Sequence, residues 1–411
     1  MTTTDAPDLA TLFSPEHRAD PYPAYRRWRD NAPVAELAPG FLVLSSHEAC
    51  SAVLRDPAFG HAGPDDDVPG PLGGGRPRGS DTSLLDDDGR PVISFLGLNP
   101  PDHTRLRRLV SKAFTARTVA GLVPRVEEIT TELIDAALDA GEVDLLKALA
   151  EPLPVRIISE MLGVPASDHE RFAGWSHAMA RGTDPAFLLS DETLAAVSTA
   201  REEYSDYFRE LAARRRADPG DDLLSALVGV SDAGDTLTEN ELLVTCILLL
   251  TAGHETTVNL IGNGTLALLR HPEQLAALRD DPDVAEPAVE ELLRYDSPVQ
   301  LTVRQALQDT AIGDVATPRG TVALTLVGAA NRDPAAHEDP GRLDVTRPPS
   351  RHLAFGQGIH FCLGAPLARA EGRTALRELA RRAPDLRLAG EPSWKENVTL
   401  RGLATLPVTL R

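Results

Sequence analysis

The feature that most constrains the fold is a long apolar segment that begins after Thr238 and ends near Arg270. Thr238 and Glu241 form a capping box, which is a signature of a helix N-terminus, and a His-Pro pair at 271–272 ends the pattern. The predicted helix has roughly 32 residues and is roughly 48 Å long at 1.5 Å per residue. Because its first half is apolar on nearly all sides, we expect it to run through the middle of a large protein.

Shorter patterns on either side of this helix predict a mainly α protein with a smaller β part. Strand-like alternation is concentrated in residues 34–60, 299–328 and 385–411, and the remainder is predicted to be helical. Residues 60–91 are dominated by Gly, Pro and Asp and are expected to form a loop. No internal repeat is visible, and we expect residues 1–411 to form a single domain.

The composition excludes several classes of protein. Lys and Arg number 41 against 61 Asp and Glu, so the net charge of −20 argues against nucleic acid or an anionic membrane as a partner. The three cysteines, Cys50, Cys246 and Cys362, are far apart and odd in number, which is typical of a reducing cytosol and not of a disulfide framework. No signal peptide is apparent, and the most apolar run, 242–250, is far shorter than the ~20 residues of a membrane span. We therefore expect a cytoplasmic protein.

A glycine-rich run around one of these cysteines carries the chemistry. Residues 355–364 read Phe-Gly-Gln-Gly-Ile-His-Phe-Cys-Leu-Gly and directly precede an apolar-periodic helix at 365–380. Its glycines indicate a tightly bent backbone. Cys362 lies at the start of the following helix, where free N–H groups and the helix dipole favour a thiolate, a good ligand for a soft metal centre. A cysteine taken alone is more often a small buried apolar residue, so its context decides.

This run resembles the haem-ligand loop of the cytochrome P450 family, which reads Phe-Gly-x-Gly-x-His-x-Cys-x-Gly in bacterial members, at all six fixed positions. The resemblance implies a cytochrome P450 fold, with haem b between the long central helix and the helix that follows the loop. It also implies that Cys362 is the ligand of the iron. The other cofactor-binding residues implied in the loop are Phe355, Gly356, His360 and Gly364.

A second match lies in the long helix. The sequence Ala-Gly-His-Glu-Thr-Thr at 252–257 resembles the oxygen-activation motif of the family. Ala252, Glu255 and Thr256 share one helix face, and a Thr hydroxyl can bond to the carbonyl four residues back and loosen the helix locally. The resemblance implies that Ala252 lies against the haem and that Thr256 and Glu255 route protons to bound oxygen. The plainer alternative is an ordinary pair of buried hydroxyls at 256 and 257.

Haem carries two propionates, which need cationic or donor partners. His103 and Arg107, four residues apart, resemble a family segment that binds a propionate, and Arg304 and His360 match the other two contacts of the family. A single Arg is more often plain surface charge, so the inference depends on the set of four.

A third match is structural and not catalytic. Glu291 and Arg294 are one helical turn apart, and such a pair is usually solvated. The pair resembles the Glu-x-x-Arg signature of the family, in which both residues form a buried network with a later arginine and hold the Cys loop. Arg342 is expected to be that arginine, although family members usually have Glu and Phe where this chain has Gly341 and Leu343.

The resemblance implies a haem-thiolate monooxygenase that inserts one atom of O2, by hydroxylation or epoxidation, into a medium or large hydrophobic natural product such as a polyketide, macrolide or terpenoid. Electrons are expected to come from NAD(P)H through a ferredoxin reductase and a ferredoxin, and the chain is expected to be a monomer. One alternative is the same fold catalysing oxidative aromatic cross-linking without oxygen insertion. Another is a non-catalytic haem or scaffold protein, although related domains of that kind tend to lose the Cys or the acid–alcohol pair.

Two surfaces complete the prediction. The residues expected to line the substrate pocket are mostly apolar: Leu84, Leu85, Phe95, Leu248, Val299, Leu301 and Thr399. A basic stripe on the helix after the Cys loop and on an earlier helix is expected to dock an acidic electron donor, with a solvated helix face as the plain alternative. The stripe consists of Arg369, Arg373 and Arg377, together with Arg105, Arg108 and Lys112.

Overall fold

The structure is a computed structural model that describes residues 12–63, 84–86, 88–185 and 188–411. Its helices are α2 (Tyr22–Asn31), α3 (His47–Arg55), α4 (Asp102–Ala113), α5 (Ala116–Ala140), α6 (Pro152–Met161), α7 (His169–Arg181), α8 (Asp191–Ala217), α9 (Leu223–Gly229), α10 (Glu239–Leu269), α11 (Pro272–Asp280), α12 (Ala285–Tyr295), α13 (Val327–Ala330) and α14 (Ala365–Arg382). A π-helical turn precedes α6 at Leu146–Ala150. Most of the loop predicted at 60–91 lies outside the described residues.

The strands are short and lie mainly in the three regions predicted to be β-rich. They are β1 (Val34–Ala38), β2 (Phe41–Leu44), β3 (Phe59–Gly60), β4 (Glu142–Asp144), β5 (Ser231–Asp232), β6 (Asp235–Thr236), β7 (Leu301–Ala306), β8 (Thr310–Ile312), β9 (Val315–Thr317), β10 (Val322–Leu326), β11 (Arg387–Leu388), β12 (Ser393–Trp394), β13 (Leu403–Thr405) and β14 (Pro407–Thr409). The mainly α fold with a smaller β part is confirmed.

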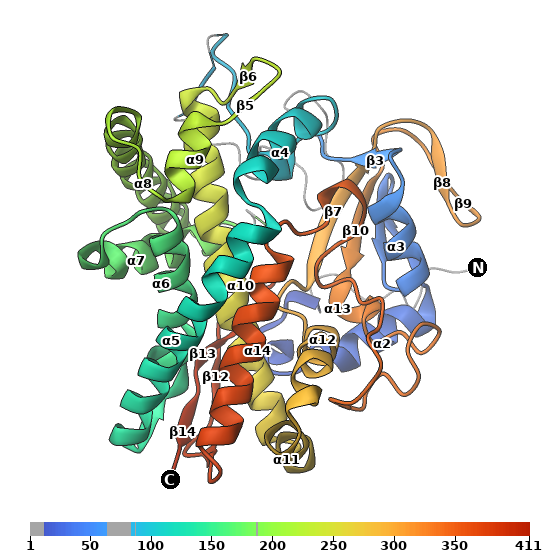
Figure 1. The fold of residues 1–411 in the computed structure, drawn as a ribbon. Coiled ribbons are helices and arrows are strands. Elements are labelled where there is room, and N and C mark those ends of the chain that lie inside the picture. Colours follow the sequence, from blue (N-terminus) through green and yellow to red (C-terminus); the bar gives the residue numbers. More distant parts are fainter. Residues whose placement is uncertain (1–11, 64–83, 87, 186–187) are drawn as a thin grey trace.

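Helix α10 is the centre of the helical part, as its length and apolar surface predict. Its N-terminus has the predicted capping box: the Thr238 hydroxyl accepts from the Glu241 N–H at 3.2 Å, and the Glu241 carboxylate accepts from the Thr238 N–H at 2.9 Å. The helix packs against α6, α7, α8 and α14 (Figure 1). Among the described helices, only α10 is long and apolar enough to cross a membrane, a criterion that a buried core helix also meets.

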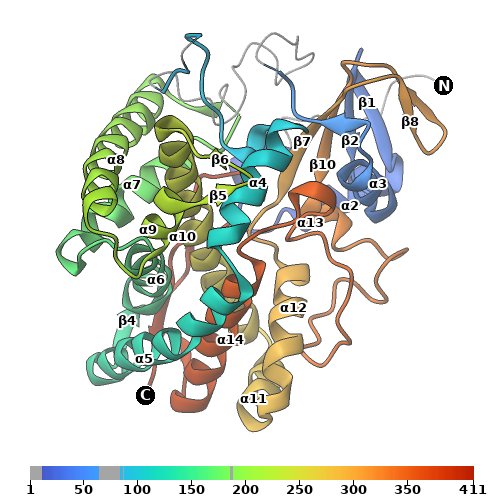
Figure 2. The same cartoon turned by 45° about the horizontal axis from the view of Figure 1, so that its top comes forward.

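The main sheet lies on the opposite side of the molecule from α5–α9 (Figure 2). Its strand order is β1-β2-β10-β7-β3, with β10 parallel to β2 and the other pairs antiparallel. Alternation along β2 gives the sheet two apolar faces. Phe41 and Val43 pack toward α2, and Leu42 and Leu44 pack toward α3.

Two pieces of β structure fall in the part predicted to be helical. Strand β4 follows Gly141, whose φ of 80° ends α5, and it pairs with β14. Strands β5 and β6 form a hairpin whose turn residues, Ala233 and Gly234, both have positive φ. Segments of two or three residues are too short to show an alternating pattern, so the sequence could not predict them.

Candidate functional site

The glycine-rich run folds back on itself and presents Cys362 at the N-terminus of α14. The Cys362 N–H donates to the Phe355 carbonyl at 2.9 Å, which closes the loop. Gly356 and Gly358 have φ of 65° and 67°, and a Cβ on Gly358 would lie 2.4 Å from the Leu54 carbonyl oxygen. The loop therefore requires glycine where the sequence has it.

The groups around the Cys362 sulfur have opposing effects on the pKa of its thiol. Burial raises the pKa of the Cys362 thiol, while the N–H groups of Gly364 and Ala365 and the nearby Arg107 and Arg369 pull it down. The balance in the protein alone favours the thiol. A metal ion at the sulfur would reverse that balance, because a coordinated thiol is deprotonated.

On α10, which is a continuous helix, the predicted side-chain bond of the threonine is present. The Thr256 hydroxyl donates to the Ala252 carbonyl at 2.6 Å, as expected from the spacing of the two residues. The same geometry recurs further along the helix, where the Thr265 hydroxyl donates to the Ile261 carbonyl at 2.8 Å. Only the first of these two threonines follows an acidic residue, Glu255.

Glu255 is buried and belongs to an ion pair that the sequence did not reveal. Its carboxylate contacts the Lys395 ammonium, and the two side chains are only 3% and 7% exposed. On the other side, His177 of α7 lies with Nδ1 3.9 Å from the carboxylate. Burial alone would raise the pKa of Glu255, but the charge and hydrogen bond of Lys395 hold it below its usual range. Lys395 follows β12 in a polar stretch far along the chain, which gave no signal of this contact.

Four predicted residues from three elements form a cluster of two guanidinium groups and two imidazoles. His103 and Arg107 come from α4, Arg304 from β7 and His360 from the Cys loop. The ring centroids of His103 and His360 are 4.4 Å apart. Arg107 donates to the Phe361 carbonyl of the same loop.

The cluster lacks negative charge among the residues that the structure describes. The Arg304 guanidinium is buried and, among the described residues, donates only to the Thr302 hydroxyl and the Val303 carbonyl; burial lowers its pKa to about 10. Both ring nitrogens of His360 are buried and have no hydrogen-bond partner within the described ranges. Burial, together with Arg304, His103 and Arg107, lowers the pKa of His360 to about 3. A dianionic group at this place would satisfy these donors, so the residues fit the two propionates of a haem.

The sequence did not indicate a further imidazole in this cluster, that of His61, whose ring centroid is 4.9 Å from that of His360. Asn99 holds the His61 backbone: its Oδ1 accepts from the His61 N–H and its Nδ2 donates to the His61 carbonyl, both at 2.8 Å. Gly60 allows this approach, since a Cβ there would lie 2.2 Å from Asn99 Oδ1.

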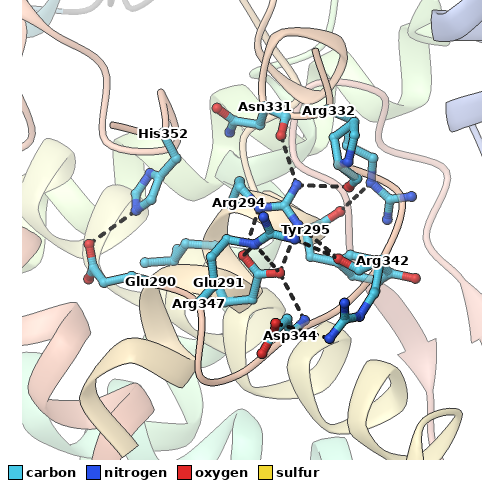
Figure 3. Close-up of polar contacts among 12 residues, drawn as sticks. Glu290, Glu291, Arg294, Tyr295, Asn331, Arg332, Arg342, Asp344, Arg347 and His352 are labelled. Carbon is cyan, nitrogen blue, oxygen red and sulfur yellow. Dashed lines mark hydrogen bonds and ion pairs between the residues drawn. The ribbon is translucent and has the colours of Figure 1, made fainter. Parts of the chain in front are cut away.

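The Glu291–Arg294 pair lies in a buried polar network (Figure 3). Arg294 Nε and Nη2 lie 2.7 and 2.8 Å from the two oxygens of Glu291, and neither side chain is more than 1% exposed. Arg294 also donates to the carbonyls of Asn331, Pro340 and Arg342. The Asn331 side chain accepts from the Leu353 N–H at 2.7 Å, which ties the network to the start of the Cys loop.

The prediction that Arg342 completes this network is wrong. Its side chain is 62% exposed and pairs with Asp344, and only its backbone carbonyl meets Arg294. The third arginine is Arg347, whose Nε lies 3.2 Å from Glu291 (Figure 3). The Arg342 side chain points outward, whereas the chain meets Glu291 first through the Asp344 N–H, at 3.0 Å, and then through the Arg347 side chain.

The residues predicted to line a pocket divide into two groups. Leu84 and Phe95 are buried in one apolar cluster, against which Leu248 packs. Val299 pairs with Leu400, next to Thr399, whose carbonyl accepts from the Gln300 N–H.

The other two predicted pocket residues are corrected by the structure. Leu85 is 43% exposed and lies at the surface, where its carbonyl accepts from Asn240. Leu301 packs with Trp28 of α2, because alternation along β7 turns it away from the face that carries Thr302 and Arg304.

The predicted basic stripe is partly neutralised. Arg369 forms a bidentate pair with Glu290, at 2.6 and 3.0 Å. The three cations of α4 pair with acids at the β5–β6 hairpin and the start of α10: Arg105 with Asp235 and Glu241, and Arg108 and Lys112 with Asp232. Arg373 and Arg377 remain exposed on α14.

Comparison with known proteins identifies the family. Residues 91–382 match the family model described as Cytochrome P450. The chain belongs to the cytochrome P450 family. It is 42% identical to cytochrome P450 monooxygenase PikC of Streptomyces venezuelae, over 100% of this chain and 96% of PikC. It is 44% identical to the polyketide biosynthesis cytochrome P450 PksS of Bacillus subtilis, over 77% of each chain.

A solved P450 structure has the same fold. Mycobacterium smegmatis CYP164A2 with econazole bound superposes with a TM-score of 0.86 and 43% identity, over 98% of this chain and 99% of that one. The predicted fold and enzyme class are therefore confirmed: the protein is a bacterial-type P450 monooxygenase. As a P450 it uses haem and O2, and it acts on a small molecule with electrons supplied by redox partners.

Proposed function

We propose that this P450 hydroxylates or epoxidises a medium or large hydrophobic natural product of the polyketide, macrolide or terpenoid kind. The observation that carries the haem chemistry is the cluster of two arginines and two imidazoles beside Cys362, which has donors for a dianion and no acid among the described residues. The substrate class is supported by the apolar cluster around Leu84 and Phe95 and by the relative named for polyketide biosynthesis.

In this proposal, Cys362 is the residue that would ligate the haem iron, through its thiolate. His103, Arg107, Arg304 and His360 bind the propionates. Phe355, Gly356 and Gly364 shape the loop, and Ala252, exposed on α10, would be the contact of the cofactor with that helix. Haem b, when bound, supplies the centre that binds O2 and oxidises the substrate.

The protons are routed through α10. Thr256 holds a proton at its Oγ1, and the bond from this hydroxyl to the Ala252 carbonyl fixes its position. Glu255 is ionised beside Lys395 and can accept and release a proton at its carboxylate. His177, with its side chain 59% exposed, connects that carboxylate with solvent.

The electrons are proposed to come from NAD(P)H through a ferredoxin reductase and an acidic ferredoxin. Arg373 and Arg377 are exposed cations on α14 that such a donor would meet, whereas Arg381, exposed in the last turn of α14, is paired with Glu378. Arg108 and Lys112 already form ion pairs with Asp232 of the same chain. We further propose that residues 1–411 act as one domain, as a cytoplasmic monomer, which sedimentation of the haem-loaded protein would test for oligomeric state.

The substrate is tested by a spectral screen of polyketides, macrolides and terpenoids against the ferric protein. A true substrate displaces water from the iron, which shifts the Soret absorption band. Each compound that binds is then turned over under 18O2, and its product is expected to carry one labelled oxygen. A coupled aromatic product without label would contradict oxygen insertion and favour cross-linking.

A further inference from the structure

A buried carboxylate outside the chemistry described above lies just beyond the end of α7. Asp184 is 4% exposed, and its Oδ1 accepts from the backbone N–H groups of Thr399 at 2.8 Å and Val398 at 3.1 Å. Its one charged partner within the described ranges is Arg181, with Nη1 3.4 Å from Oδ2. Asp184 therefore binds a turn that is more than 200 residues away in the chain.

Further contacts join the same two segments in the opposite direction. The Thr399 hydroxyl donates to the Thr183 carbonyl at 3.1 Å, and the Asn397 side chain donates to the Ala180 carbonyl at 3.2 Å. Side chains of both segments therefore hold the end of α7 and the turn at 397–399 together.

The turn also contacts the elements that carry the proposed chemistry. The Thr399 carbonyl accepts from the Gln300 N–H at 2.9 Å, and the Arg401 N–H donates to the Pro298 carbonyl at 2.7 Å, which ties the turn to the segment leading into β7. Just before the turn, Lys395 reaches Glu255 of α10. The turn therefore connects α7, α10 and β7.

We propose that Asp184 is a positioning residue for substrate specificity: it holds against α7 the 397–399 turn, which carries Thr399, one of the residues expected to line the substrate pocket, and so limits the room for bulky ligands. Its polar partners among the described residues are this turn and Arg181, so it acts through the turn. The ligand part of this inference depends on the proposed haem site, whereas the holding of the turn does not.

The carboxylate suits this role because it satisfies two buried N–H groups with one oxygen. In Asp184→Ala those N–H groups lose their acceptor, and a buried unpaired donor is costly. In Asp184→Asn the amide Oδ1 can still accept both bonds, so this variant retains the turn. Glu396→Ala is the matched control: this residue lies beside the same turn, but its side chain is 68% exposed and meets Arg18 and Arg181 only at 3.6 and 3.5 Å.

The first test is amide hydrogen exchange of Val398 and Thr399 in the full-length protein. Asp184→Ala is expected to speed their exchange by about 10-fold, while Asp184→Asn and Glu396→Ala stay within about 2-fold of the wild type. Exchange in Asp184→Ala within that 2-fold range would overturn the holding role.

The second test compares a small and a bulky ligand of the iron, imidazole and econazole, by their absorption shifts in the haem-loaded protein. Asp184→Ala is expected to weaken econazole binding by about 10-fold and leave imidazole binding unchanged, with Asp184→Asn restoring the wild-type value. Equal losses for both ligands, or no loss for econazole, would overturn the specificity role. Failure of imidazole to bind the wild type would instead contradict the haem site, and the exchange experiment would still decide the holding role.

Discussion

The buried ion pair between Glu255 and Lys395 joins two side chains that are 140 positions apart in the chain. Both charges are largely shielded from water, so each depends on the other for its stability. The sequence indicated Glu255, because its motif is local, but Lys395 could be recognised only once the fold had placed the end of β12 beside α10. The same applies to His61 and Asn99 beside the propionate cluster.

Replacing Lys395 with Met is expected to cost about 3 kcal/mol of unfolding free energy at pH 7, because Glu255 is left buried and unpaired. Lys395 lowers the pKa of Glu255 in the folded state, so the stabilisation is present above the unfolded pKa and is lost as the pH falls through the folded value. The difference between wild type and variant should therefore shrink below about pH 4. Urea unfolding across pH measures this.

Lys147→Met is the control for this variant, because Lys147 is 69% exposed in its pair with Glu151. It should cost less than about 1 kcal/mol at any pH. Equal costs for the two variants, or a cost for Lys395→Met that does not change with pH, would contradict the role of the buried pair.

Thr256→Ala is expected to uncouple the enzyme, so that reductant is consumed and peroxide is released while product per NAD(P)H falls by about 10-fold or more. The physical reason is loss of the hydroxyl that holds a proton beside Ala252. Thr265→Ala removes a hydroxyl with the same bond to its own helix and should leave coupling intact. Coupling that is equal in both variants would argue against the proton route.

At the scale of elements, predictions succeeded where the determining residues are neighbours in the chain. The sequence predicted α10 to within one residue at each end, because its capping box and its His-Pro end are local signals. The Cys loop and the Thr256 bond to Ala252 are local for the same reason. The sequence did not predict which side of β7 Leu301 faces, or that Arg347 and not Arg342 contacts Glu291. Both features depend on how separate elements pack.

Arg347→Ala is expected to destabilise the protein by about 2 kcal/mol, because it removes a charged donor from the buried Glu291. Arg342→Ala removes an exposed side chain and should cost less than about 0.5 kcal/mol. Denaturant unfolding of the two variants measures the difference. A larger cost for Arg342→Ala would show that the network is completed as the sequence first indicated.

At the scale of the whole molecule, the charged side chains are unevenly distributed. The chain has a net charge of −20, yet exposed cations lie on α14 behind the Cys loop. The basic face predicted from sequence is smaller in the structure, since Asp232 and Glu290 neutralise three of its members. Their pairing could not be foreseen, because the β5–β6 hairpin had no sequence signal.

Arg373→Glu is expected to slow reduction of the iron by an acidic ferredoxin by about 10-fold at low salt, because it repels the donor without disturbing the buried core. The effect should diminish as ionic strength rises. Arg381→Glu, in the last turn of α14, is the control and should leave the rate unchanged. Stopped-flow reduction measures both, and an unchanged rate in Arg373→Glu would remove α14 from the docking surface.

The central claim is that the sulfur of Cys362 ligates a haem iron, and the absorption spectrum of the reduced protein under carbon monoxide tests it most directly. The wild type is expected to show the red-shifted Soret band of a thiolate-ligated haem. Cys362→His should lose that band, and Cys246→Ala, which changes a buried cysteine in α10, should retain it. A wild-type protein that binds haem without this band, or a Cys362→His variant that keeps it, would contradict the account.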